Sequence, residues 1–192
     1  MPEGVLGDRG KALEEQFFAR QDEELKRQLR ERRRADDARE SLAAALDVDP
    51  SAVPDELIAL DLSPESVAAF AMVPLVVVAW ADGQIDEKER SAILAAAEQA
   101  HVEAGSPSHK LLADWLQRQP PSTLIDAWNS YAAAISESVG DEAREEIRRD
   151  VIHRARAVAE ATGGILGFGS KVSTREEQAL LEIEGAFQRG PS

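Results

Sequence analysis

The chain of 192 residues contains no cysteine, and this absence excludes several kinds of site together. Without thiols it cannot form disulfides, thiolate-bound zinc sites, iron–sulfur clusters or a cysteine nucleophile. A metal site would have to be built from carboxylates, which favours hard cations such as Ca²⁺, Mg²⁺ or Mn²⁺. Aromatic residues are also scarce, at 5% of the chain.

Basic charge is in short supply as well. Lys and Arg number 22 against 36 Asp and Glu, which gives a net charge of −14. Nucleic acids and anionic membrane surfaces are bound through basic patches, so this balance argues against both as partners.

No apolar run is long enough for a membrane span. The longest, from Val67 to Ala81, contains Pro74 and falls short of the roughly 20 residues that a transmembrane helix needs. It favours a helix buried inside a bundle and no membrane insertion. The N-terminus lacks the basic start and apolar stretch of a secretory signal, so we expect a cytoplasmic protein.

Helix-forming residues are abundant, with 32 alanines in the chain. No segment alternates apolar and polar residues over a strand's length, so the sequence predicts an all-α fold. We expect a compact multi-helix bundle preceded by a long charged N-terminal helix. The expected divisions are an N-terminal helical arm at 1–46, a connecting segment with a short helix near Val53–Leu60 at 47–62, the bundle at 63–187 and a tail at 188–192.

The N-terminal arm is dense in charge but nearly neutral. Residues 1–45 hold 10 basic and 11 acidic side chains, whereas residues 46–192 carry a net charge of −13. The arm also bears a narrow apolar stripe at helical spacing. We predict that this stripe binds a protein partner or a second copy of the chain, as in a coiled coil, or packs on the acidic domain; a solvated arm with little contact is the alternative. The predicted partner-binding residues are Leu13, Phe17, Phe18, Leu25 and Leu29.

Local signals place the helices of the bundle. Ser63-Pro64-Glu65 predicts the start of a helix that runs to Ala81, bends near Pro74 and ends at Asp82-Gly83. Asp86 and Glu89 form the pattern of a capping box that begins the next helix. Breaks at 105–107, 120–122 and 140–141 separate three further helices. A last helix would carry Leu180, Leu181, Ile183 and Phe187.

Two parts of the bundle resemble each other, which predicts two pseudo-repeated helix–turn–helix units. Val78–Glu89 is an apolar helix end, a glycine, a β-branched residue and a helix cap with Glu at its third position. The same order recurs in Val158–Gly163 and, after an insertion, Val172–Glu176.

The segment Ala-Trp-Ala-Asp-Gly-Gln-Ile-Asp-Glu-Lys-Glu, Ala79–Glu89, resembles the TerB-like (tellurite-resistance B) family of helical domains. The resemblance covers about residues 63–187 and not the arm. It implies a small helical bundle without established catalysis, linked to stress response and tellurite resistance, with acidic positions suspected of binding metal. Here those positions are Asp82, Asp86 and Glu89. The second unit departs from the pattern, because Thr162 replaces the motif's Asp and Ile165–Lys171 is inserted, so a symmetric acidic site is in doubt.

The acidic segment has two interpretations. Read as half of an EF-hand loop, it lacks oxygen ligands at the positions of Val78 and Trp80, so it could hold a cation only with help from water or another carboxylate. Alternatively, Gly83 permits a left-handed helix end, and Asp86 and Glu89 simply cap the next helix.

Other signals for catalysis are weak. The Gly-rich stretch 163–171 lacks the spacing of a phosphate loop, and its Ile165–Phe168 part either packs into the bundle or meets a partner. His101, His109 and His153 fall on separate helices or helix ends without a metal-ligand spacing, and no nucleophile motif appears. We therefore expect a non-enzymatic protein: either a TerB-like bundle in a stress-response or metal-handling context that binds a divalent cation, or a structural or adaptor protein that acts through its N-terminal helix.

Overall fold

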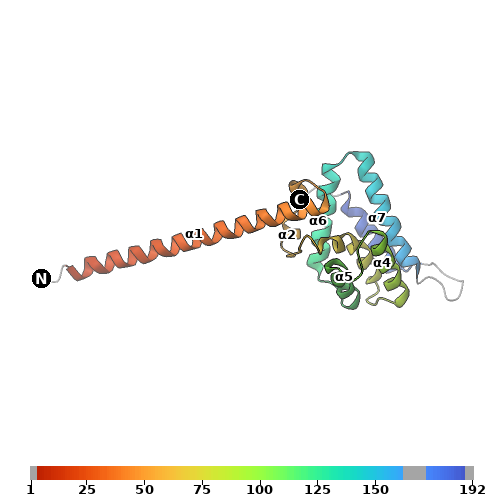
Figure 1. Ribbon diagram of the computed structural model, residues 1–192, viewed down its shortest axis with the longest axis horizontal. Helices are drawn as coiled ribbons and strands as arrows, with labels where there is room; N and C mark the ends of the chain where they lie inside the picture. Colours follow the sequence, from red (N-terminus) through yellow and green to blue (C-terminus); the bar gives the residue numbers. More distant parts are fainter. Residues whose placement is uncertain (1–3, 162–171, 189–192) are drawn as a thin grey trace. The chain divides into compact units, whose positions relative to one another are not determined.

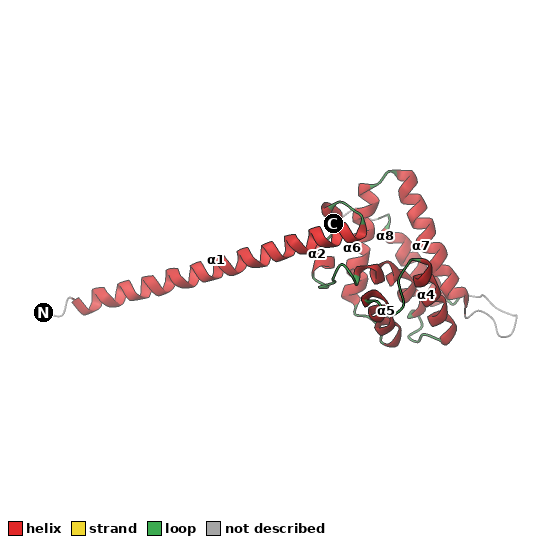
Figure 2. Ribbon diagram, in the orientation of Figure 1, coloured by secondary structure: helices red, strands yellow, loops and turns green. Residues whose placement is uncertain are grey.

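The computed structural model describes residues 4–161 and 172–188, with side chains described from Phe17 onward. Within these ranges all regular structure is helical, as Figures 1 and 2 show, so the predicted all-α bundle is confirmed. None of the described helices combines the length and apolar composition needed to cross a bilayer. The α-helices are α1 (Gly4–Leu46), α2 (Asp55–Ile58), α3 (Val73–Ala79), α4 (Glu87–Gln99), α5 (Pro107–Gln117), α6 (Ser122–Ser138), α7 (Asp141–Ala161) and α8 (Thr174–Ala186), with 3-10 helices η1 (Pro50–Ala52) and η2 (Val67–Met72).

The chain divides into two compact units, Met1–Glu40 and Ser41–Ser192. The first unit is the greater part of α1, which contains no Pro and no Gly after Gly10 to interrupt it. The last residues of α1 belong to the second unit, where Leu42 and Ala43 are buried in the core. The second unit therefore begins at Ser41, before α1 ends at Leu46, whereas the sequence placed all of residues 1–46 in the arm and began the bundle at residue 63.

Helix α3 is the centre of the second unit. Val73, Leu75, Val76 and Val78 are each at most 1% exposed. A helix that is apolar on every side has no face to present to water, so it is stable only when other helices surround it. Helices α4, α6, α7 and α8 all contact α3. The interpretation of Val67–Ala81 as a buried segment is confirmed.

The expected start of that helix at Ser63 is wrong. Ser63 lies outside any helix, and its N–H donates to Oγ of Ser66 at 3.0 Å while that hydroxyl donates back to the carbonyl of Ser63. Side-chain bonds of this kind compete with helix formation. The chain enters η2 at Val67 and becomes an α-helix only at Val73, one residue before Pro74.

Pro74 thus begins an α-helix instead of bending one. It stands in the first turn of α3, where a missing N–H costs nothing and the fixed φ suits the helix. The expected helix near Val53–Leu60 is also shorter, because Val53 has an extended backbone (φ −97°, ψ 104°) and α2 covers only Asp55–Ile58. A residue before proline is disfavoured in the α region, and Pro54 follows Val53.

The two predicted helix–turn–helix units correspond to α3 with α4 and α7 with α8. Within the two helix pairs, α3 contacts α4 and α7 contacts α8. Between the pairs, α3 contacts α7 and α8, and α4 contacts α7. Exchanging the two helix pairs leaves this set of contacts unchanged, as a pseudo-repeat requires. Arg148–Glu184 and Arg156–Glu177 ion pairs also join α7 to α8.

Side chains on α8 follow the helical pattern with one exception. Leu180, Ile183 and Phe187 are buried, but Leu181 is 61% exposed. Leu181 follows Leu180 by 100° around the helix and therefore leaves the narrow buried face. Trp115 and Trp128 are buried, and the ring of Trp128 meets Phe187 edge to face.

Candidate functional site

The first candidate site is the turn between α3 and α4, which holds Asp82, Asp86 and Glu89. Asp86 precedes α4, and its Oδ1 accepts the backbone N–H groups of Lys88 at 2.7 Å and Glu89 at 2.9 Å. The Glu89 Oε2 accepts the N–H of Asp86 at 2.9 Å, which completes the predicted capping box. Both residues therefore satisfy N–H groups that the first helical turn leaves without partners.

Asp82 and Gly83 form the turn that precedes this cap. The Asp82 Oδ1 accepts the N–H of Gln84 at 3.0 Å, and Gly83 has φ +91°, in the left-handed region. A residue with a Cβ is strained there, so glycine is required by the backbone. The positive φ expected at Gly83 is confirmed, but α3 already ends at Ala79 and turns follow from Trp80, so the expected end of that helix at Asp82-Gly83 is wrong.

The start of α8 repeats this construction. The Ser173 Oγ accepts the N–H of Glu176 at 3.2 Å, and the Glu176 Oε2 accepts the N–H of Ser173 at 2.6 Å. The neighbouring Arg175 donates from Nη1 to the carbonyl oxygen of Asp82 at 3.4 Å, which links the two turns directly. The similarity seen in the sequence is thus a real structural likeness between two helix starts that meet in the fold.

The two capping glutamates are nearly inaccessible to water. Glu89 is 5% exposed and Glu176 is 6% exposed. Burial, as the largest cause, and repulsion from the carboxylates of Asp86, Glu176 and Asp82 together raise the pKa of Glu89 to about 7, against the lowering effect of the hydrogen bond from the Asp86 N–H. Sequence reasoning noted Glu176 as a cap but missed it as a member of this group, because only the packing of α8 against α3 brings it close.

The three predicted metal ligands all serve as turn or helix caps. Among the described residues, no group of three or more His, Asp or Glu side chains is arranged to hold a metal ion. The observed hydrogen bonds of Asp82, Asp86 and Glu89 go to backbone N–H groups, as expected of turn and helix caps. His101 and His153 are exposed, and His101 adopts a positive φ of 62° at the end of α4.

The second candidate site is the apolar stripe on α1. Its described members are strongly exposed: Phe17 58%, Phe18 64%, Leu25 55% and Leu29 51%. The rings of Phe17 and Phe18 meet edge to face with centroids 5.9 Å apart. The side chain of Leu13 and the loop Ile165–Phe168 lie outside the described residues.

The charges around this stripe are paired along the helix. Lys26 binds Asp22 at 2.6 Å, and Arg27 binds Glu24 at 2.7 Å. The Glu24 Oε1 also accepts a hydrogen bond from the amide of Gln28 at 3.0 Å. Pairs three and four residues apart support an isolated helix by about 0.2–0.5 kcal/mol each, so the charges help this helix to exist without burying its apolar side chains.

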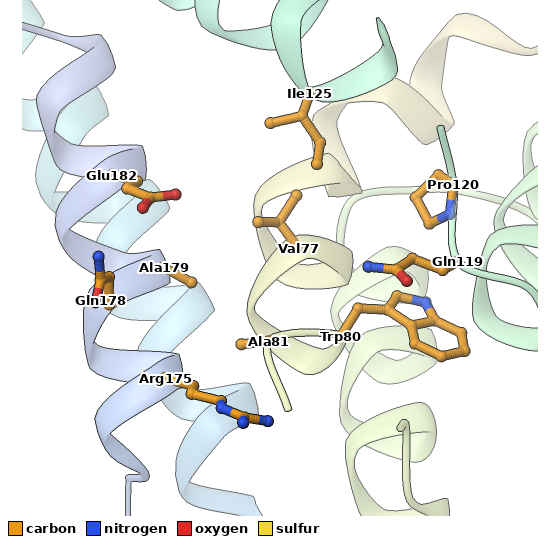
Figure 3. A pocket seen from close by; sticks show the side chains of 10 residues that line it. All are labelled: Val77, Trp80, Ala81, Gln119, Pro120, Ile125, Arg175, Gln178, Ala179 and Glu182. Atoms are coloured by element: carbon orange, nitrogen blue, oxygen red, sulfur yellow. The ribbon is translucent and has the colours of Figure 1, made fainter. Parts of the chain in front are cut away.

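The third candidate is a groove in the second unit, with a volume of about 320 Å³, lined by residues of α3 and α8 on two sides and by Gln119 and Pro120 from the segment between α5 and α6 (Figure 3). Val77, Ala81, Ile125 and Ala179 supply apolar walls, and Trp80 donates from its ring nitrogen to the carbonyl of Trp115 at 2.8 Å. Arg175 and Glu182 on α8 are the charged lining residues. The remaining lining residues are Gln119, Pro120 and Gln178. Sequence reasoning did not find this groove, because its walls come from segments about 100 residues apart.

Comparisons of the chain with protein-family models, with curated proteins and with solved structures gave no match. The resemblance of Ala79–Glu89 to the TerB-like family therefore stands as a prediction from the motif alone.

Proposed function

We propose that this chain is a helical adaptor protein that binds another polypeptide through the apolar stripe of α1. The observation that supports this most directly is the exposure of four large apolar side chains, each by more than half, on a helix whose other residues are mostly charged. Exposed apolar clusters of this kind mark interaction sites on soluble proteins, because covering them removes apolar area from water.

The spacing of the stripe suits a helical partner or a groove that receives a helix. Phe18, Leu25 and Leu29 follow one another at intervals of seven and four, which keeps them within about 40° of one another around the helix at 100° per residue. An amphipathic helix docks through residues at such intervals, either in a coiled coil or in an apolar groove. Phe17 lies beside this line and widens it.

The test compares the full chain with a stripe variant, Phe18→Ala/Leu25→Ala/Leu29→Ala. All three side chains are exposed, and alanine favours helix, so the variant should keep its helical circular dichroism. The matched control, Glu23→Ala/Arg30→Ala/Arg34→Ala, changes three exposed residues on the opposite side of the helix. Chemical cross-linking of each protein, alone and in extracts of the cells that produce it, reports binding to itself and to other proteins.

We expect cross-linked products in the parent and the control and their loss, by about tenfold or more, in the stripe variant, since two or three buried apolar side chains contribute several kcal/mol. Identical cross-linking in all three proteins would contradict the proposal, because the stripe would then have no binding role.

The TerB-like hypothesis makes a separate prediction, that a divalent cation binds at Asp82, Asp86 and Glu89 in a stress-response or metal-handling role. Calorimetric titration with Ca²⁺, Mg²⁺, Mn²⁺ and Zn²⁺ tests it on the parent and on Asp82→Ala/Glu89→Ala. Saturable binding that the double variant loses would support the metal site and would show that the turn does more than cap α4. Absence of such binding in the parent would contradict it.

A further inference from the structure

The charge along α1 is distributed in two blocks of opposite sign. Residues 14–24 contain five acidic residues and one basic residue, whereas residues 26–34 contain six basic residues and one acidic residue. The apolar residues Phe18, Leu25 and Leu29 lie across the junction of these blocks. A helix with this arrangement is complementary to itself when two copies run in opposite directions.

We propose that the occupant of the α1 stripe is a second copy of the same helix, bound antiparallel with Phe18 facing Leu29 of the second copy. This inference rests on the proposed function, because it identifies the partner that the stripe binds. The two-fold symmetry of such a dimer uses the same surface on both chains, so each contact occurs twice.

The heptad spacing fixes the register. The surface along which the two helices would meet, here called the seam, contains two lines of residues, each repeating every seven residues. One line is formed by residues 18, 25 and 32, and the other by residues 15, 22, 29 and 36. When Phe18 faces Leu29 of the second copy, facing residues have numbers that add to 47. The same register sets Glu15 opposite Arg32 and Lys11 opposite Asp36, so the ends of the seam carry opposite charges, and it sets Leu25 opposite Asp22 near the middle.

Other arrangements place like charges together. A parallel, in-register pair sets Glu15 against Glu15 and Arg32 against Arg32, and it brings the two basic blocks side by side. An antiparallel pair centred on Leu25 sets Phe18 against Arg32 and Glu14 against Asp36. Like charges that face each other across a seam destabilise the pair and select against these alternatives.

The test is sedimentation equilibrium of the full chain over a range of concentrations. We expect the parent to pass from the mass of one chain, 20.9 kDa, toward twice that mass as its concentration rises. Glu15→Arg and Arg32→Glu should each weaken self-association by about tenfold or more, because each creates two like-charged pairs per dimer. An equimolar mixture of the two variants should regain the parent's association, because every facing pair in the mixed dimer is again of opposite sign. Arg and Glu are both good helix formers, and circular dichroism checks that neither variant loses helix.

A second measurement fixes the register independently. Because the chain has no cysteine, Glu15→Cys and Arg32→Cys each introduce its single thiol. Under mild oxidation, the mixture of the two should form a disulfide-linked dimer faster than either variant alone. Faster linkage of Glu15→Cys with itself would indicate a parallel pair and would overturn the proposal.

The outcomes separate this inference from the proposed function. A parent that stays monomeric at all concentrations overturns the second copy as partner; if the stripe variant still loses cross-links to another protein, the adaptor function stands. A monomeric parent whose cross-links do not depend on the stripe contradicts both. A dimer that Glu15→Arg leaves unchanged overturns the antiparallel register alone.

Discussion

Glu89 and Glu176 place two carboxyl groups inside the second unit, at the first turns of α4 and α8. The position of each in the chain is a local matter, since a glutamate three residues after a capping residue is a familiar pattern. Their burial depends on residues far away in the sequence, because it requires the helix pair α3 and α4 to pack against the helix pair α7 and α8. The sequence therefore predicts the caps of these helices but not the electrostatic cost of bringing them together.

The raised pKa of Glu89 predicts how stability depends on pH. Its pKa is about 7 in the folded chain and 4.5 in the reference state, so between these values the folded chain holds a proton that the unfolded chain has lost. Stability contributed by the neutral carboxyl is complete below pH 4.5, falls as the pH rises toward 7, and is lost above it. Glu89→Gln keeps an oxygen that can accept the Asp86 N–H but cannot ionise. We expect the variant to be more stable than the parent by about 2 kcal/mol at pH 8, with the difference shrinking toward pH 4.5.

Urea unfolding of parent and variant at several pH values between 4.5 and 8 measures this difference. Glu176→Gln is the matched control, because it removes one of the carboxylates that repel Glu89. It should lower the pKa of Glu89 and so move the loss of stability to lower pH without abolishing it. Equal slopes of stability against pH in the parent and Glu89→Gln would show that Glu89 ionises in the fold as it does in the unfolded chain.

At the scale of helices, signals that act within four or five residues predict the structure well. The capping boxes before α4 and α8 form as the sequence indicates, and the predicted break at 105–107 is where α5 begins. The start at Ser63 fails because its signal is equally compatible with a turn closed by Ser66. The groove beside α3 and α8 cannot be predicted from local signals, because its residues are brought together only by the packing of the whole unit.

The cap at Asp86 gives a prediction at this scale. Asp86→Ala removes the acceptor for two N–H groups and should cost about 1 kcal/mol of stability, within the range of 0.5–2 kcal/mol measured for such caps. Asp86→Asn keeps the acceptor and removes the charge that repels Glu89, so it should be at least as stable as the parent at neutral pH. Urea unfolding at pH 7.5 compares the three proteins. Equal losses in the Ala and Asn variants would mean that the charge of Asp86, and not its capping bond, is what stabilises α4.

For the molecule as a whole, the division into an arm and a bundle is visible in composition, but the end of the arm is not. The charge-dense stretch stops near residue 45, and Asp47-Val48-Asp49-Pro50 reads as a break. In the structure the second unit begins at Ser41, because Leu42 and Ala43, each 2% exposed, are part of its core. Two apolar residues near the end of a long helix form no pattern in the sequence, so their burial in the core of the second unit cannot be predicted from it.

This difference predicts where the chain can be shortened. Deletion of residues 1–40 removes the stripe and the charge blocks but no buried side chain of the second unit, so the remaining chain should unfold cooperatively with little loss of stability. Deletion of residues 1–46 also removes Leu42, and loss of a fully buried leucine costs about 2–5 kcal/mol. Thermal and urea unfolding of the two shortened chains measures the difference, and Leu42→Ala in the full chain serves as the matched control, since it removes the same side chain and leaves α1 continuous. If the two shortened chains are equally stable, Leu42 does not contribute to the core, and the bundle folds without any residue before position 47. If deletion of residues 1–40 already unfolds the chain, the bundle depends on parts of α1 that lie before its last residues.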